Sequence, residues 1–184
     1  MKATQQLKAE HEGITLMLRV LDTICGRMES GQPFDVGHIE KMLDFFKVFV
    51  DRCHHGKEEG LLFPALEGAG IPKEGGPIGQ MLSEHEHGRA LVREMNAALS
   101  QYHTDPAASA RRFGDAGRMY IEFLTLHIQK ENQVLFRMAD QRLAEADQES
   151  LFHAFEEMEE KKIGLGTREE FHRLLDELAE IYVR

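Results

Sequence analysis

Residues 54–63 of this 184-residue chain read His-His-Gly-Lys-Glu-Glu-Gly-Leu-Leu-Phe, and residues 127–136 read His-Ile-Gln-Lys-Glu-Asn-Gln-Val-Leu-Phe. The two stretches share the pattern His-x-x-Lys-Glu-x-x-x-Leu-Phe, 73 residues apart. A second repeated element, Glu-His-Glu, precedes each of them, at residues 10–12 and 84–86. This duplication predicts two copies of a helix pair, related by an approximate two-fold axis that equivalent residues approach from opposite sides.

Apolar residues around these stretches recur every three or four positions, which is the period of amphipathic helices. The pattern predicts four long helices, at about residues 4–28, 35–67, 78–102 and 105–138, with a Gly- and Pro-rich loop at 68–77. Pro64 is expected to kink or end the second helix. No segment alternates as a strand does, so the predicted fold is an all-α, antiparallel up-down four-helix bundle.

Two additional C-terminal helices are predicted after the bundle. One carries Leu151, Phe152, Phe155 and Met158, and a break at 164–166 separates it from the other. The last helix begins at Thr167, whose spacing to Glu170 is that of a capping box, and its apolar face ends at Ile181. We therefore divide the chain into a bundle (1–140) and a helical extension (141–184) that packs on the bundle or on a second copy, as a possible homodimer. The charged run 156–162 is expected to face solvent.

The repeated histidines continue the apolar stripes of their helices and so should point inward. Each repeated glutamate follows a histidine by four residues and shares its helix face. The predicted metal site therefore comprises His11, His54, Glu58, His85, His127 and Glu131. Burying two carboxylates costs several kcal/mol each unless a charge compensates. No arginine or lysine occupies both equivalent stripe positions, so a bound cation is expected.

The donor types indicate which metal would bind. Imidazole mixed with carboxylate suits iron or manganese better than calcium, which prefers oxygen, or structural zinc, which favours four ligands including thiolate. With Glu58 and Glu131 bridging, each of two ions would receive two histidines and two carboxylate oxygens. A bridging oxo or hydroxo group would leave one octahedral position open for a small ligand. The donor types therefore predict a pair of metal ions, with iron and manganese both suitable.

Four further residues near these motifs have open or secondary roles. His55 is expected on a different helix face from His54, about 100 degrees around an α-helix. His87 has no counterpart in the first half, so we expect it outside the ligand set or at the surface. Tyr120 could donate to a metal-bound ligand, although core packing is favoured. Arg89 could face a bound anion or a glutamate of a neighbouring helix.

The remaining histidines and the cysteines have structural interpretations. Histidines near helix ends or outside the repeat are expected to be solvated or capping: His38, His103, His153 and His172. Cys25 and Cys53 are too few for a disulfide scaffold or a thiolate zinc site, and we expect both to be buried.

The charge balance and the missing motifs exclude several classes of function. A formal charge of -10 disfavours nucleic acid and anionic membranes as partners. The N-terminal residues lack the apolar core of a secretory signal and no stretch is long enough to span a bilayer, so a cytoplasmic location is expected. No nucleophile with its base and no phosphate-binding glycine loop is visible, so the sequence predicts no catalytic residues of those types.

Over about residues 5–140 the chain resembles the hemerythrin-like, or HHE cation-binding, family, particularly its bacterial cytosolic members. The resemblance rests on His11-Glu12, His54-x-x-Lys57-Glu58-Glu59-x-x-Leu62-Phe63-Pro64, Glu84-His85 and His127-x-x-x-Glu131-x-x-x-Leu135-Phe136. It implies an antiparallel four-helix bundle with a carboxylate-bridged di-iron centre that meets oxygen, nitric oxide or peroxide. The four histidines would be terminal ligands, and the two glutamates would bridge.

One departure from the family's oxygen carriers affects the expected function. The carriers have a second histidine one turn after the first on the third helix, where this chain has Arg89. The chain is more similar to the family's sensors and to its proteins of nitrosative stress or iron-cluster repair. The repair proteins also have a cysteine-bearing N-terminal segment and a further histidine on the first helix, and neither is evident here. Three hypotheses follow: a protein that binds or senses oxygen or nitric oxide, a di-iron enzyme acting on peroxide, oxygen or nitric oxide, or an iron sensor or store.

Overall fold

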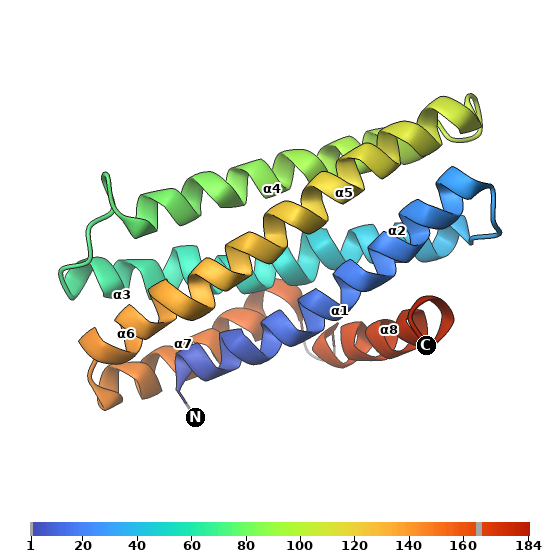
Figure 1. Ribbon diagram of the computed structural model, residues 1–184. Helices are drawn as coiled ribbons and strands as arrows, with labels where there is room; N and C mark the ends of the chain where they lie inside the picture. Colours follow the sequence, from blue (N-terminus) through green and yellow to red (C-terminus); the bar gives the residue numbers. More distant parts are fainter. Residues whose placement is uncertain (1, 165–166) are drawn as a thin grey trace.

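Helices form almost all of the computed structural model, which describes residues 2–164 and 167–184 (Figure 1). In chain order they are α1 (Ala3–Ser30), α2 (Val36–Asp44), η1 (Phe45–His55), η2 (Glu58–Leu62), α3 (Phe63–Gly68), α4 (Pro77–Ser100), α5 (Pro106–Lys130), η3 (Glu131–Leu135), α6 (Phe136–Arg142), α7 (Glu145–Ile163) and α8 (Thr167–Tyr182). No strand occurs within these two described ranges. The prediction of an all-α fold is therefore confirmed.

The elements η1, η2 and η3 are π-helical, with hydrogen bonds five residues apart and wider turns than an α-helix. They follow their neighbours without a loop, so residues 36–68 form one long helical segment and residues 106–142 another. Pro64 does not end the first of these, because it occupies the first turn of α3. Of the kink or end expected at this proline, the end was wrong, because the helical segment continues to Gly68. The fourth predicted helix runs four residues further, to Arg142.

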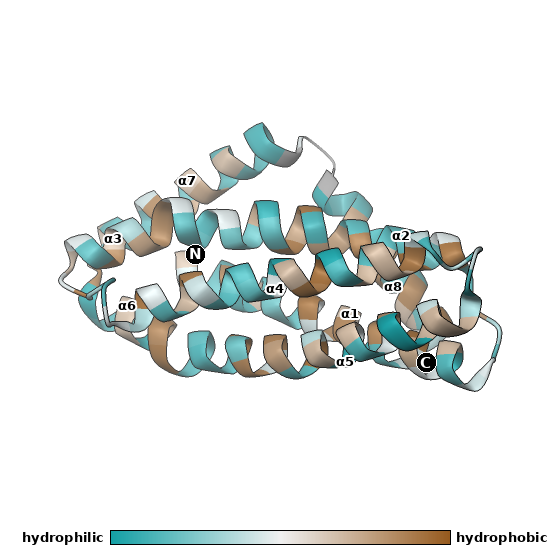
Figure 2. Ribbon diagram, turned by 90° about the horizontal axis from the view of Figure 1, so that it is seen from above, coloured by the Kyte–Doolittle hydropathy of each residue, from teal (hydrophilic) through white to brown (hydrophobic). Residues whose placement is uncertain are grey.

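The long helices lie alongside one another, and their inward faces enclose two apolar clusters (Figure 1). The larger cluster contains Phe46, Leu91 and Tyr120, and the smaller contains Leu7 and Phe136. Along every long helix the repeated histidine falls between residues of the smaller cluster and residues of the larger one. Figure 2 shows hydrophobic residues recurring between hydrophilic ones along each helix, as the predicted periodicity requires. The layer of repeated histidines therefore lies between the two apolar clusters.

The C-terminal helices pack against the same helices that carry the first half of the repeat. α7 contacts α1, η1 and η2, while α8 contacts α1 and η1. Leu175, Leu178 and Tyr182 bury the inner face of α8, whereas Ile181 is 42% exposed. The predicted inward position of Ile181 was wrong, because Tyr182 occupies the inward position of the last turn. The predicted break at Leu165 and Gly166 and the predicted capping side chain of Thr167 lie outside the described residues.

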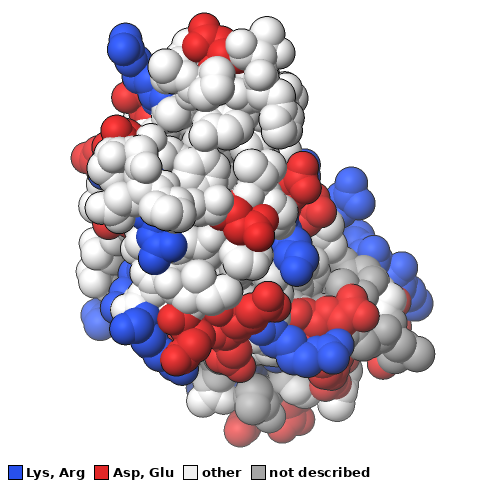
Figure 3. Space-filling model, turned by 90° about the vertical axis from the view of Figure 1, so that its right-hand side faces the viewer, with Lys and Arg blue, Asp and Glu red and all other residues white. Residues whose placement is uncertain are grey.

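The surface carries charges of both signs. Figure 3 shows acidic and basic side chains intermingled over one part of the face drawn, and mostly uncharged residues over the rest. Among the described helices, none is both long and apolar enough to cross a bilayer.

Candidate metal centre

The six predicted site residues come together in the interior. Their exposed fractions are at most 2%: His11, His54, Glu58, His85, His127 and Glu131. His11 Nε2 and His127 Nε2 lie 3.2 and 3.1 Å from the two oxygens of Glu131. On the other carboxylate, His85 Nε2 lies 3.4 Å and His54 Nε2 3.7 Å from oxygens of Glu58. Both repeated helix pairs thus supply donors to one layer, as predicted from the duplication.

Most of the inward-facing donor atoms have no hydrogen-bond partner. Buried and unpartnered are His11 Nε2, His55 Nδ1, His85 Nε2, His127 Nε2 and all four carboxylate oxygens of Glu58 and Glu131. Unpaired buried polar atoms are rare, and two facing carboxylates repel each other. Two donors that each lie about 2.1 Å from one ion at right angles are about 3 Å apart. The shortest separations between these donors are close to that value, so the residues present fit a bound cation.

The donors form two groups whose ligand atoms lie close together. In the first group, His11, His54, Glu58 and Glu131 each offer an atom within 4.8 Å of the others. In the second, His55, His85 and His127 do the same. The second group contains a histidine that the sequence analysis placed on another face.

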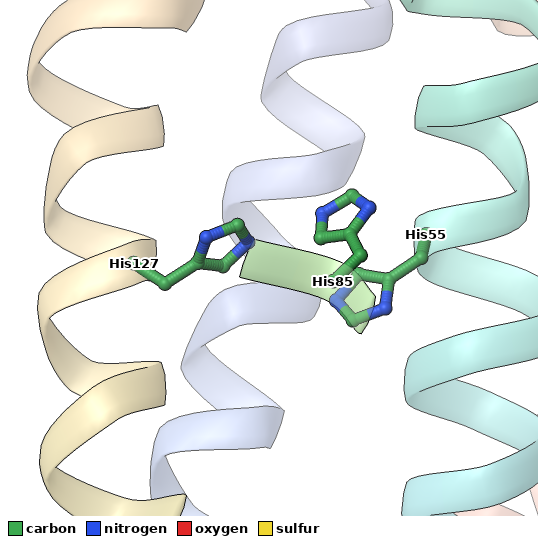
Figure 4. A group of neighbouring side chains, drawn as sticks. All are labelled: His55, His85 and His127. Carbon is green, nitrogen blue, oxygen red and sulfur yellow. The ribbon is translucent and has the colours of Figure 1, made fainter. Parts of the chain in front are cut away.

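His55 is 5% exposed and points into the centre, so its predicted exclusion from the inward face was wrong (Figure 4). The cause is the π-helical winding of η1, whose wider turn leaves a smaller angle between successive side chains than an α-helix. His54 and His55 therefore both face inward from adjacent positions. Figure 4 shows His55, His85 and His127 converging from three helices, and the His55 ring stacks on that of His85, with centroids 3.8 Å apart and planes 13° apart.

A ring of polar groups outside the centre orients the four predicted histidines through Nδ1. The distances are 2.8 Å from His54 to Glu10, 2.8 Å from His127 to Glu84, 2.7 Å from His85 to Glu59 and 3.0 Å from His11 to Asn132. A partner on Nδ1 turns Nε2 toward the centre and makes it a better donor. These four partners were missed in the sequence. Glu10 and Glu84 carried a signal nonetheless, because both belong to the repeated Glu-His-Glu element.

The repeated lysines neutralise the repeated outer carboxylates. Lys57 Nζ lies 2.5 Å from Glu10, and Lys130 bonds Glu84 in the same way. No arginine or lysine was predicted at both equivalent inward positions, and these lysines indeed pair with the outer glutamates rather than with Glu58 and Glu131. Among the ion pairs of the described residues, the two bridging candidates therefore have histidine partners and no lysine or arginine.

The electrostatics match these contacts. Burial favours the neutral acid at Glu10, but the hydrogen bond from His54 and the charge of Lys57 outweigh it and lower the pKa of Glu10 to about 2. Burial lowers the pKa of His54 to about 4, against the opposing bond to Glu10. Burial and the nearby charge of Glu131 hold the pKa of Glu58 well above its ordinary value. Without a cation, the centre thus favours a proton on one of its two carboxyl groups.

A cavity of about 320 Å³ lies beside the centre. Its lining includes His55, Tyr120, Val92 and Gly88. Arg89, also at its wall, donates to Asp51 at 2.7 Å, Glu59 at 2.7 Å and Glu86 at 2.6 Å. Of the two roles considered for Arg89, contact with glutamates of its surroundings is therefore the one observed. Tyr120 packs edge-on against Phe46, with 5.0 Å between ring centroids, and so takes part in the core as expected.

The other histidines lie away from the centre. His87, His103, His153 and His172 are exposed, and the half-buried His38 bonds the hydroxyl of Tyr182 at 3.0 Å. Cys25 and Cys53 are buried free thiols, as predicted. Burial raises the pKa of both thiols to about 12, which disfavours the thiolate that would bind a metal.

This combination of helices and inward-facing imidazoles and carboxylates defines the class as a helical cation-binding protein. A protein-family model, described as "Hemerythrin HHE cation binding domain", matches residues 2–139 of this chain. The chain therefore belongs to the hemerythrin HHE cation-binding domain family. Comparison with curated proteins and with solved structures gave no match.

Proposed function

We propose that this protein holds a carboxylate-bridged pair of iron ions in an antiparallel four-helix bundle and binds or senses a small diatomic ligand, oxygen or nitric oxide. The observation that carries the proposal is the set of buried, unpartnered donor atoms on two facing carboxylates and the histidines around them. A cation is the simplest group that compensates all of them together. Family membership supports a cation of this kind.

The proposed roles at the centre are metal binding, bridging and the orientation of the histidine rings. His11 and His54 would hold one ion, His85 and His127 the other, and Glu58 and Glu131 would bridge the two. Glu10, Glu84, Glu59 and Asn132 keep the four rings in the binding orientation. Iron would supply Lewis acidity and electrons to a ligand at an open position. The two apolar clusters on either side keep bulk water out of the layer.

The cavity beside His55 supports a small exogenous ligand rather than a sealed structural metal. The residues that line the cavity include His55, which belongs to the second donor group, and Arg93, which is exposed at the surface. Structural metal sites are closed, whereas reactive sites keep an accessible position. We propose this cavity as the path by which the ligand enters.

The test is iron content per chain in protein purified anaerobically from iron-replete cells, beside a His54→Ala variant. Two irons per chain, reduced in the variant, would support the site. Titration with oxygen and nitric oxide would then separate binding from turnover. A reversible spectrum without consumption of reductant is expected, and steady turnover with a reductant would favour the di-iron enzyme instead. Iron absent from both proteins would overturn the proposal.

A further inference from the structure

The repeat extends beyond the metal donors to a matched set of outer residues. Glu10 accepts from Gln6, His54 and Lys57, and Glu84 accepts from Gln80, His127 and Lys130. Each member of one set has its counterpart 73 or 74 residues later in the other. The two halves therefore orient His54 and His127 with the same chemistry.

The two lysines differ sharply in what surrounds them. The side chain of Lys57 is 0% exposed, and its Nζ also donates to Glu159 of α7 at 2.8 Å. The side chain of Lys130 is 45% exposed, and Glu84 is its one carboxylate partner within the described residues. One half of the site is thus covered by the C-terminal extension through a buried ion pair, while its counterpart is open to water.

The sequence provides room for α7 on one half alone. A Cβ added at Gly60 would lie 3.0 Å from Met158 Cε, so Gly60 allows the close approach of α7, whereas one at Gly56 would meet Lys162 Nζ at the ordinary contact distance of 3.4 Å. The equivalent positions of the second copy, 73 residues later, are Gln129 and Gln133. Those longer side chains would keep a helix from approaching the second copy in the same way. Residues of the repeat and of the extension therefore both contribute to the difference in cover between the two halves.

We propose that Glu159 is a positioning residue for the metal position at His11 and His54, so that the C-terminal extension strengthens ion binding at that position and not at the position of His85 and His127. This inference rests on the proposed two-metal centre. Glu159 neutralises Lys57, which leaves Glu10 free to polarise the Nδ1 proton of His54. A more polarised imidazole is a stronger donor through Nε2. At the second copy the charge of Lys130 is shared with solvent instead.

The experiment titrates the metal-free full-length protein with Co²⁺, followed by the absorption bands of bound cobalt. Glu159→Gln removes the charge and keeps the shape. Glu157→Gln is the matched control, because Glu157 lies on the same helix, is 70% exposed and pairs with Lys161 at the surface. We expect two binding steps in the wild type and in the control. In Glu159→Gln, one step should weaken by about tenfold, and the bands of that ion should shift.

Hydrogen exchange of the α7 amides, measured on the same samples, reports whether the helix stays docked. A weakened step with the α7 amides still protected supports the positioning role, whereas a weakened step together with lost α7 protection would show that Glu159 only holds the helix in place and would overturn it. Two unchanged steps in Glu159→Gln would overturn it. A wild type that binds fewer than two ions would contradict the two-metal proposal itself, and the inference would fall with it.

Discussion

The rings of His55 and His85 are stacked, with centroids 3.8 Å apart and planes 13° apart. An imidazole binds a metal through a nitrogen lone pair that lies in the ring plane. Two stacked and nearly parallel rings cannot both contain the same ion in their planes. His55 must therefore turn out of this stack before it can share an ion with His85, even though its Nδ1 is buried and unpartnered.

Substitution of His55 by Phe tests that relationship, because the aromatic ring preserves the stack and removes the nitrogens. Both metal ions should remain, since the other four histidines and both carboxylates are unchanged. Metal content per chain by elemental analysis is the measurement, with His85→Phe as the variant that should lose metal. Loss of one ion from His55→Phe would instead identify His55 as a fifth ligand.

The two central glutamates should be individually indispensable. Alanine at Glu58 or Glu131 is expected to remove both ions, because each carboxylate would bridge the pair. Glu122→Ala, at an exposed position of α5, should retain both. Iron content per chain distinguishes these outcomes, and full retention in either central variant would disprove the bridging assignment.

The repeated lysines should contribute very unequally to stability. Lys57→Met would leave Glu10 buried without its lysine and Glu159 with Arg168, 3.8 Å away, as its remaining basic partner. Removing one partner of a buried ion pair typically costs about 3–5 kcal/mol. Lys130→Met removes a pair whose lysine is 45% exposed, and the expected cost is below about 1 kcal/mol. Urea unfolding of the metal-free proteins gives both values. Similar losses would show that burial by α7 does not strengthen the first pair.

The low pKa of Glu10 predicts that the free energy of unfolding decreases in acid. Its folded pKa of about 2 lies below the ordinary value of 4.5, so its contribution to stability is complete above about pH 5 and is lost as the pH falls from 4.5 toward 2. Between pH 6 and 3.5 the loss from this group should be about 1 kcal/mol. Urea unfolding at both pH values should show a smaller decrease for Glu10→Gln than for the wild type. The exposed Glu12→Gln should behave as the wild type.

The cavity gives a kinetic prediction. Val92→Trp would fill part of it without touching the predicted ligands, and should slow the association of azide or nitric oxide with the metal-loaded protein by at least about tenfold. Ala90→Trp, exposed on the same helix, should leave the rate unchanged. Stopped-flow absorbance provides the rates, and metal content should be equal in all three proteins. Equal rates would mean that ligands reach the centre by another path.

The convergence of the repeated histidines and glutamates could be predicted from the sequence because the duplication marks them twice. His54 and His127 occur in the same motif, each with a glutamate four residues later, so one copy supports the interpretation of the other. The outer carboxylates Glu10 and Glu84 are duplicated as well, but adjacent residues on a helix point in different directions. Only the packing of the helices shows that each reaches a histidine of another helix.

The inward positions of two residues could not be predicted from the sequence, for different physical reasons. His55 was expected on a different helix face from His54 because α-helical periodicity was assumed. No local sequence pattern predicts a π-helix. Glu159 lies in the charged run 156–162, where neighbouring charges do face solvent. It pairs with Lys57, about a hundred residues earlier, and such long-range contacts do not show in local patterns.

The π-helical winding of η1 also makes chain length a determinant of which side chains surround the metal. Shortening the segment 45–53 by one residue would let it wind as an α-helix, and two successive histidines could no longer face the same interior. The number of nitrogen donors at the centre could therefore change through a single insertion or deletion, with every histidine still present. Related chains that keep both histidines but differ in the length of this segment are then expected to differ in the donor set itself.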